Sequence, residues 1–287
     1  MALDFPDSPV DGEVYEGFVW DNTSQTWRVR PDSPSIAVEY LIIAGGGGGG
    51  HGDGTSRGGA GGAGGYRCSV SGELSGGGAS SEPVFYAREG VSYTVTVGAG
   101  GASGYASPDN AGGSGETSSF GPVWSTGGAG GPRNYTTATG HGGSGAGAGA
   151  QNLGVLRYGS PGIPGQGYAG GNMQGSSSNA GGGGGAGGAG SQPTAGVGVS
   201  SSITGSAVTR ATGGPGNSQT TGAANTGDGG GSGFGAAYAG VGGSGVVILK
   251  VPGATILTVG AGLTYTSATV GSNTVYTFTA GTDTVTF

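Results

Sequence analysis

Short runs of alternating apolar and polar residues stand at both ends of the chain. Residues 14–20 and 26–29 are rich in aromatic and β-branched side chains, and residues 21–25 between them have turn-forming composition. This pattern predicts a small β hairpin. Near the C-terminus, threonine alternates with apolar residues, which predicts half-buried antiparallel strands. These runs are residues 255–259, 263–266, 274–278 and 284–287.

Further strand-like runs occur at intervals through the middle of the chain. They are residues 37–43, 66–70, 84–87, 93–97 and 246–251. The sequence at 88–90 favours a hairpin turn between two of these runs. Because no stretch has helical periodicity, the pattern predicts an all-β protein with essentially no α-helix, built on a jelly-roll-like β sandwich.

Glycine dominates the region between these strands. The chain has 77 glycines, and 70 of them lie between residues 45 and 250. In residues 45–65, most non-glycine side chains fall three residues apart, and residues 181–190 repeat this spacing. Three residues per turn is the period of the extended polyproline-II-like helix. We therefore expect a bundle of polyglycine-II helices inserted at one end of the sandwich; the alternative is a set of flexible glycine linkers.

Such a bundle needs support from the strands. Ordering glycine costs more backbone entropy than ordering any other residue, and each hydrogen bond returns little net free energy. We therefore expect the β frame to hold the helices in place. The composition divides the chain into an N-terminal β module, a glycine-rich domain on a β-sandwich frame and a C-terminal β module. The expected boundaries are 1–34, 35–251 and 252–287.

Charge and motifs exclude several classes of function. The formal net charge is −7 with only nine Lys and Arg residues, which disfavours nucleic-acid binding. No apolar run is long enough to span a membrane, and the N-terminal residues are not typical of a secretory signal. The single cysteine, Cys68, cannot form an internal disulfide, and we expect it to be a small buried side chain. No phosphate-binding loop, nucleophile elbow or metal-ligand cluster is present, so we expect neither enzymatic activity nor a cofactor.

Several of these segments together resemble a known family. In order along the chain they are Leu41 to Gly45, Gly-Gly-Tyr at 64–66, Ser92 to Gly101, Ser119-Phe120-Gly121 and Gly242 to Ile248. Residues 36–251 as a whole are similar to the glycine-rich domains of bacteriophage tail-fibre and adhesin proteins, especially those of cyanophages. The opening Asp4 to Trp27 resembles, more loosely, short N-terminal modules of phage virion proteins.

The resemblance implies both a fold and a function. Related folds are the phage adhesins with stacked polyglycine-II helices and the glycine-rich region of the anaplastic lymphoma kinase receptor, which sits on a tumour-necrosis-factor-like jelly roll. The implied function is a virion structural protein, a tail fibre or adhesin that attaches the particle to the host cell. We expect it in the virion, after assembly in the host cytoplasm. The alternatives are a capsid or neck decoration protein without receptor binding and an ice-binding glycine-helix protein.

The resemblance also implies partners and candidate site residues. The expected partners are other tail, baseplate or fibre proteins, a host glycan or outer-membrane protein, and further copies of the chain, with a trimer favoured. Candidate receptor contacts are Arg133, Asn134, Tyr135, Arg157, Tyr158, Tyr168 and Arg210. Candidate virion-docking residues are Tyr15, Phe18, Trp20 and Trp27. The first group could equally pack and cap the bundle, and the two tryptophans could form a sugar platform or a small core.

Overall fold

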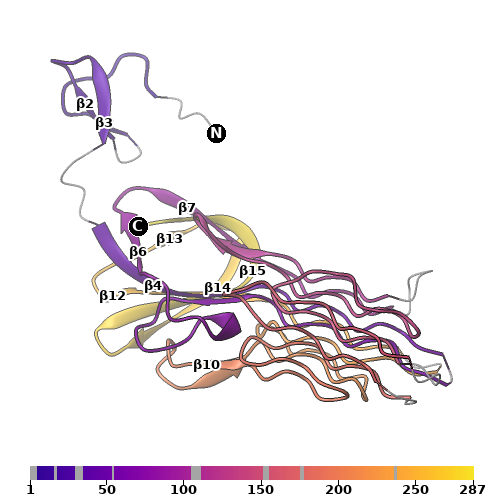
Figure 1. Cartoon of the computed structure of the whole chain (residues 1–287). Helices are drawn as coiled ribbons and strands as arrows, with labels where there is room; N and C mark the ends of the chain where they lie inside the picture. Colours follow the sequence, from indigo (N-terminus) through magenta and orange to yellow (C-terminus); the bar gives the residue numbers. More distant parts are fainter. Residues whose placement is uncertain are drawn as a thin grey trace.

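The structure is a computed structural model of the whole chain. It describes residues 5–15, 18–29, 35–53, 55–104, 111–150, 155–174, 178–235 and 238–287. Figure 1 shows a small N-terminal sheet, a large antiparallel sheet and a bundle of extended chains that projects from the large sheet. Within the described residues the only helical element is a 3₁₀ turn, η1 (Gly76–Gly78), so the all-β prediction is confirmed. No helix in the described part of the chain is long and apolar enough to cross a bilayer.

The N-terminal sheet has three antiparallel strands, β1 (Val14–Tyr15), β2 (Phe18–Asp21) and β3 (Thr26–Val29). Residues 22–25 form the turn between β2 and β3, and Trp20 pairs with Trp27 across it. The predicted hairpin is therefore present. Asp21 fixes the turn because its Oδ1 accepts hydrogen bonds from the backbone N–H groups of Thr23 and Ser24, at 2.9 and 3.2 Å.

The large sheet follows the order β5-β4-β12-β15-β7-β8-β9, with β6 on β4 and with β13 and β14 on β15. The strand bounds are β4 (Ser35–Ile43), β5 (Tyr66–Cys68), β6 (Phe85–Arg88), β7 (Ser92–Val97), β8 (Ser118–Phe120), β9 (Val123–Ser125), β12 (Val246–Pro252), β13 (Thr258–Val259), β14 (Leu263–Val270) and β15 (Asn273–Thr286). The two ends of this order approach each other, so the sheet is nearly closed. Ser125 Oγ donates to the carbonyl of Ile42 at 2.8 Å, and Arg67 Nη1 donates to that of Trp124 at 3.2 Å.

The central strands β4 and β12 are buried on both faces. One face of each lines the inside of the sheet, where Tyr40, Ile42, Leu249 and Phe278 belong to one apolar cluster. The opposite face packs against the base of the glycine bundle in a second cluster. That cluster contains Leu41, Ile43, Ala63, Tyr66, Cys68, Ala186, Ile203, Ala211, Val246, Ile248 and Val275. The same two strands therefore anchor both the frame and the bundle.

Strand pairing around the C-terminal segment and around residues 88–90 is non-local. The C-terminal segment 252–287 adds its strands to the large sheet. Its long strand β15 pairs with β12 through its first half and with β7 through its second half. The change of partner occurs at Gly281, whose φ of +98° suits glycine. The turn at 88–90 is present, but the strands on either side pair elsewhere, β6 with β4 and β7 with β15.

The glycine segments hydrogen-bond to one another with a strict period of three. In residues 45–50, the N–H groups of Gly45 and Gly48 donate to Glu116 and Gly113 of one neighbouring chain. Gly46 and Gly49 donate to residues 243 and 240 of a second neighbour, and Gly47 and Gly50 donate to residues 62 and 59 of a third. Each residue therefore points about one third of a turn away from the previous one, as in a threefold extended helix.

The carbonyl groups of the same segment point to three other chains. They accept hydrogen bonds from residues 128 and 131, from 101 and 104, and from 230 and 233, again alternating with period three. Residues 45–50 therefore have six hydrogen-bonded neighbours, three reached through N–H groups and three through C=O groups. This is the packing of polyglycine II, so the predicted helix bundle is confirmed and the linker alternative is wrong. We call this bundle the glycine lattice.

Close approach of the chains explains why glycine is required in the lattice. A Cβ atom built on Gly47 would overlap with the carbonyl group of Ala129, and one on Gly61 would overlap with that of Gly47. Gly140, on an outer chain, differs from both. The nearest atom to its Cβ would be the Ala129 Cβ at 3.8 Å, which is ordinary van der Waals contact.

We predict that Gly47→Ala lowers the free energy of unfolding by about 3 kcal/mol or more, because backbone must shift to admit the methyl group. The matched control Gly140→Ala should be neutral or stabilising by roughly 0.5 kcal/mol, because it restricts the unfolded chain without a clash. Denaturant unfolding monitored by circular dichroism measures both. Equal stability of the two variants would contradict the close packing described above.

Candidate binding surface at the distal end of the lattice

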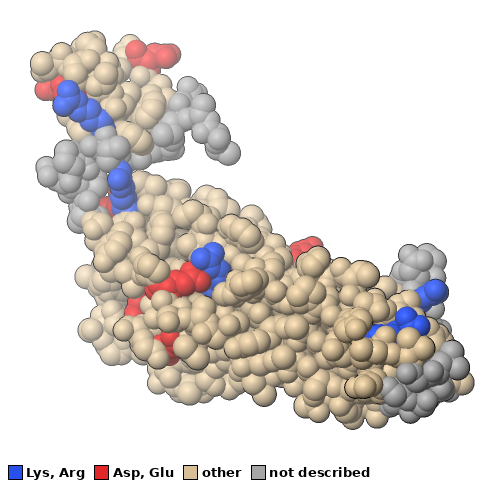
Figure 2. Space-filling view, viewed as in Figure 1, with Lys and Arg blue, Asp and Glu red and all other residues tan. Residues whose placement is uncertain are grey.

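The lattice chains turn back at the end remote from the large sheet, which we call the distal end (Figure 1). The described residues at these turns include His51–Asp53 with Thr55–Gly58 (called the turn at 51–58), residues 133–137, residues 217–219, and Phe234 with Gly235. In Figure 2, charged side chains are sparse along the body of the lattice, and Lys or Arg side chains are visible at this end as well as over the N-terminal module and the frame. Large polar side chains are excluded from the lattice interior by its packing, so the turns are where the chain can display them.

The turn at residues 51–58 is organised by Asp53. Its Oδ1 accepts hydrogen bonds from the Thr55 N–H at 2.8 Å, the Thr55 hydroxyl at 2.7 Å and the Ser56 N–H at 2.8 Å. Burial alone would raise the pKa of this carboxyl group, but these hydrogen bonds outweigh it and lower the pKa to about 2. Asp53 is therefore a charged, pre-ordered part of the distal end.

The neighbouring turn at 133–137 contacts the turn at 51–58. The Tyr135 hydroxyl lies 2.9 Å from Thr55 Oγ1, and the Asn134 N–H donates to the carbonyl of His51 at 3.3 Å. Tyr135 has a φ of +61°, and its backbone N–H donates to Ala150 at 3.0 Å. The two turns therefore form one connected surface.

The partly buried Arg57 side chain links two segments at the distal end. Its guanidinium carbon lies 4.8 Å from the centroid of the Phe234 ring, and Nη1 donates to the carbonyl of Ser232 at 3.4 Å. Burial lowers the pKa of Arg57. This geometry ties the turn at 51–58 to Phe234 through a cation–π contact.

The structure brings some of the candidate receptor contacts together. Arg133 is exposed, Tyr135 is 37% exposed and Asn134 is half-buried, all on one turn. Tyr158 is 56% exposed, and its carbonyl accepts a hydrogen bond from Ala138, just after that turn. Arg157 is half-buried beside it and pairs through its backbone with Met173. Leu153, close to this group in the sequence, lies outside the described residues.

Two candidates lie near the sheet instead. The Tyr168 hydroxyl lies against Gly78 of η1. Arg210 ends β11 (Val208–Arg210), which pairs with β10 (Val199–Ser201) beside the large sheet (Figure 1). Burial lowers the pKa of Arg210, which lies partly inside the protein near Tyr66. Neither residue shares a surface with Arg133, so any binding role for them would be separate from the distal end.

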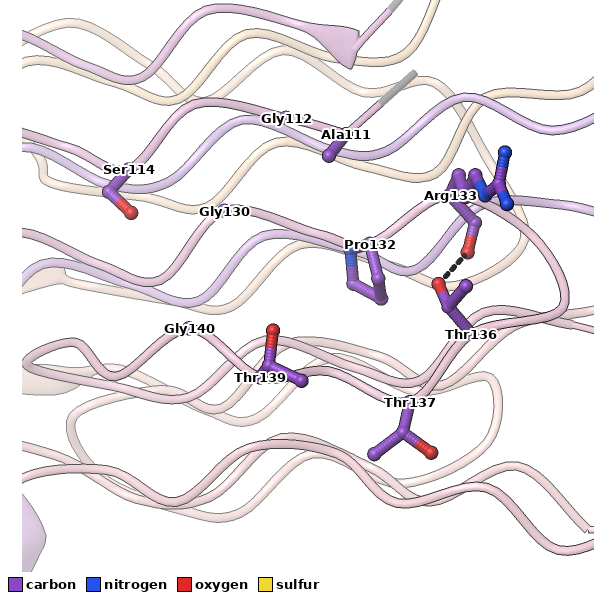
Figure 3. A pocket seen from close by; sticks show the side chains of 10 residues that line it. All are labelled: Ala111, Gly112, Ser114, Gly130, Pro132, Arg133, Thr136, Thr137, Thr139 and Gly140. Carbon is purple, nitrogen blue, oxygen red and sulfur yellow. Dashed lines mark hydrogen bonds between the residues drawn. The ribbon is translucent and has the colours of Figure 1, made fainter. Parts of the chain in front are cut away.

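A groove runs along the lattice beside the turn at 133–137, with a volume of about 550 Å³ (Figure 3). Residues 130–132 form its floor, residues 111–114 and 137–140 form its sides, and Arg133 stands at one end. The Thr136 hydroxyl donates to the carbonyl of Arg133 at 2.7 Å and fixes the turn there. The sequence did not single out this groove, because it is formed by three separate chains.

The candidate docking aromatics form one cluster in the N-terminal sheet. Phe5 stacks on Trp27 with ring centroids 5.1 Å apart and also contacts Tyr15 and Phe18, while Trp20 contacts Trp27 at 5.6 Å. Because Phe5 lies against Trp27, the two tryptophans do not form an open sugar platform in this structure. The cluster serves as the core of the module, and its docking role stays a prediction.

Other chemistry is sparse in the described part of the chain. No group of three or more His, Cys, Asp or Glu side chains there could hold a metal ion. Cys68 is buried as expected, and burial raises the pKa of its thiol to about 12. The turn at 51–58 was missed as a site, although Asp53, Thr55 and Ser56 interrupt the three-residue spacing of residues 45–65. That interruption marks the point where a lattice chain turns.

The fold is thus that of a glycine-lattice protein on an antiparallel β frame. A profile of glycine-rich domains matches residues 22–252, which is most of the chain, and the chain belongs to this family of glycine-rich domains. A search of curated proteins found no similar sequence.

We predict that the turn at 51–58 keeps its order until the pH falls toward 2. The pKa of Asp53 is depressed below its unfolded value, so its stabilising contribution is complete above about pH 4 and is lost as the pH falls through about 2. NMR amide signals of Thr55 and Ser56 should shift over this range. The control variant Asp53→Ala lacks the acceptor, so its Thr55 and Ser56 signals should already lie at the low-pH positions at neutral pH. If the signals of the native protein shifted with a midpoint near pH 4, the hydrogen bonds to Asp53 would not lower its pKa, and the prediction would be wrong.

Proposed function

We propose that the protein is a bacteriophage tail fibre or adhesin that attaches the particle to the host cell surface. The observation that supports this most strongly is the distribution of side chains along the lattice. Its body carries few charged residues, whereas Arg133, Tyr135 and Tyr158 are exposed at or near the distal end. A stiff body with recognition groups at one end suits attachment at a distance.

The physical basis for a stiff body is the hydrogen-bond pattern of the lattice. A chain such as residues 45–50 is bonded to neighbours in six directions, so bending it would break bonds to several chains at once. Tyr and Arg side chains with small polar neighbours are common at recognition surfaces. A host glycan or an outer-membrane protein is the proposed receptor. The N-terminal aromatic module is proposed to dock onto other fibre, tail or baseplate proteins, with a homotrimer as the favoured assembly.

We predict that the double substitution Arg133→Ala and Tyr158→Ala slows adsorption of particles to host cells by roughly tenfold or more. Both side chains are exposed, so the fold should be unaffected, and Tyr135 is left in place because it holds the turn at 51–58. The matched control is Tyr86→Ala with Arg88→Ala, an exposed pair on β6 of the frame, which should adsorb normally.

Immunogold electron microscopy with antibody against residues 100–240 should label the distal ends of tail fibres. Label over the capsid or neck, together with normal adsorption of the distal double variant, would reject the adhesin and favour a decoration protein. Particles without label, combined with slowed ice growth by the purified protein, would favour the ice-binding alternative.

We also predict that residues 1–34 fused to a fluorescent protein co-sediment with particles that lack the native protein. A fusion with Trp20→Ala and Trp27→Ala should stay in the supernatant, because the cluster that shapes the module is lost. Equal sedimentation of the two fusions would overturn the docking role of these aromatics.

A further inference from the structure

The groove beside Arg133 lies along an outer side of the glycine lattice. An interior chain, such as residues 45–50, has six hydrogen-bonded neighbours. The groove has three chains around it, residues 111–114, 130–132 and 137–140 (Figure 3). A further extended chain placed in the groove would therefore have neighbours on three sides, as an outer chain of the lattice does.

The backbone groups that line the groove are repeated at the lattice period. Within the part of the chain that the structure describes, the N–H and C=O groups of Ala111 and Ser114 have no hydrogen-bond partner. The same holds for Gly130 on the floor and for Thr137 and Gly140 on the other side. Residues 111 and 114 are three apart, as are residues 137 and 140. Each wall thus offers a donor and an acceptor once per turn of an extended helix.

The other residues that line the groove indicate which kind of ligand it could bind. Among the lining residues that the structure describes, none is aromatic; they are glycine, alanine, proline, serine, threonine and Arg133. The Arg133 guanidinium stands at the distal end of the groove, and no ion pair involves it among the described residues. A carboxylate at one end of an extended peptide would match it.

We propose that this groove binds an extended, glycine-rich segment of a partner polypeptide in the polyproline-II conformation, with an acidic residue against Arg133. The segment completes a lattice position and satisfies the donors and acceptors of three chains. A second folded copy does not fit this role, because its glycine segments are already paired within its own lattice. The inference deepens the proposed function and rests on it for the source of the segment, a loop of a host surface protein.

The test uses the full-length protein and a capped peptide of Gly-Gly-Ser repeats ending in Asp. Isothermal titration should detect binding, and amide signals of Ser114, Gly130 and Gly140 should shift on titration. A peptide with N-methylglycine at every third position should bind roughly tenfold more weakly, because it lacks the N–H donors. Replacing Asp by Lys in the peptide should have an effect of similar size.

Two substitutions in the protein test the same groove. Gly140→Leu should abolish binding, because the side chain has room to extend into the groove without a clash in the lattice. Arg133→Ala should weaken binding of the Asp peptide and strengthen that of the Lys peptide, because the repulsion between two cations is removed; a fold defect would weaken both. Arg88→Ala, an exposed arginine on β6, is the matched control and should bind normally.

Three results would overturn the inference. The first is equal binding of the native and N-methylated peptides. The second is self-association of the chain that Gly140→Leu abolishes, which would make a second copy the occupant. The third is saturable binding of an acidic oligosaccharide, such as oligogalacturonate, that competes for the same amide signals. These outcomes concern the purified protein and do not depend on the adsorption experiment, so failure of one proposal is distinguishable from failure of the other.

Discussion

Hydrogen bonds between extended glycine chains are the constraint on which the rest of this molecule depends. A threefold helix makes no bonds within itself, so each N–H and C=O group needs a neighbouring chain. Neighbours can approach on all sides only when side chains are missing, as the overlap expected for a Cβ on Gly47 illustrates. The composition of the chain, the exclusion of charge from the lattice body and the placement of larger residues at turns all follow from this single requirement.

The β frame makes the lattice possible because it aligns the chains before they leave the sheet. Strand β4 runs directly into residues 44–50, and residues 239–245 run directly into β12. These two strands are adjacent and antiparallel, with Ile43 opposite Val246, so the lattice begins in register. Apolar clusters on both faces of β4 and β12 offset part of the entropy lost in ordering so many glycines.

At the distal end, ordinary turn chemistry replaces lattice packing. Asp53 holds its turn through three hydrogen bonds, and Arg57 ties that turn to Phe234. Neither interaction needs a partner molecule, so contacts within the chain itself hold Asp53, Arg57 and Phe234 in place. A recognition surface that is already ordered loses little conformational entropy on binding, which suits the proposed role in attachment.

The sequence by itself determined the local chemistry. Alternation predicted the strands, and three-residue spacing predicted the extended helices, because these signals depend on residues near one another. The tertiary structure decided which chains became neighbours. It joined β15 to the frame, placed Tyr168 and Arg210 near the sheet, and formed the groove beside Arg133 from three distant segments. A glycine helix looks alike on all its sides, so its sequence carries almost no information about which helix packs against which.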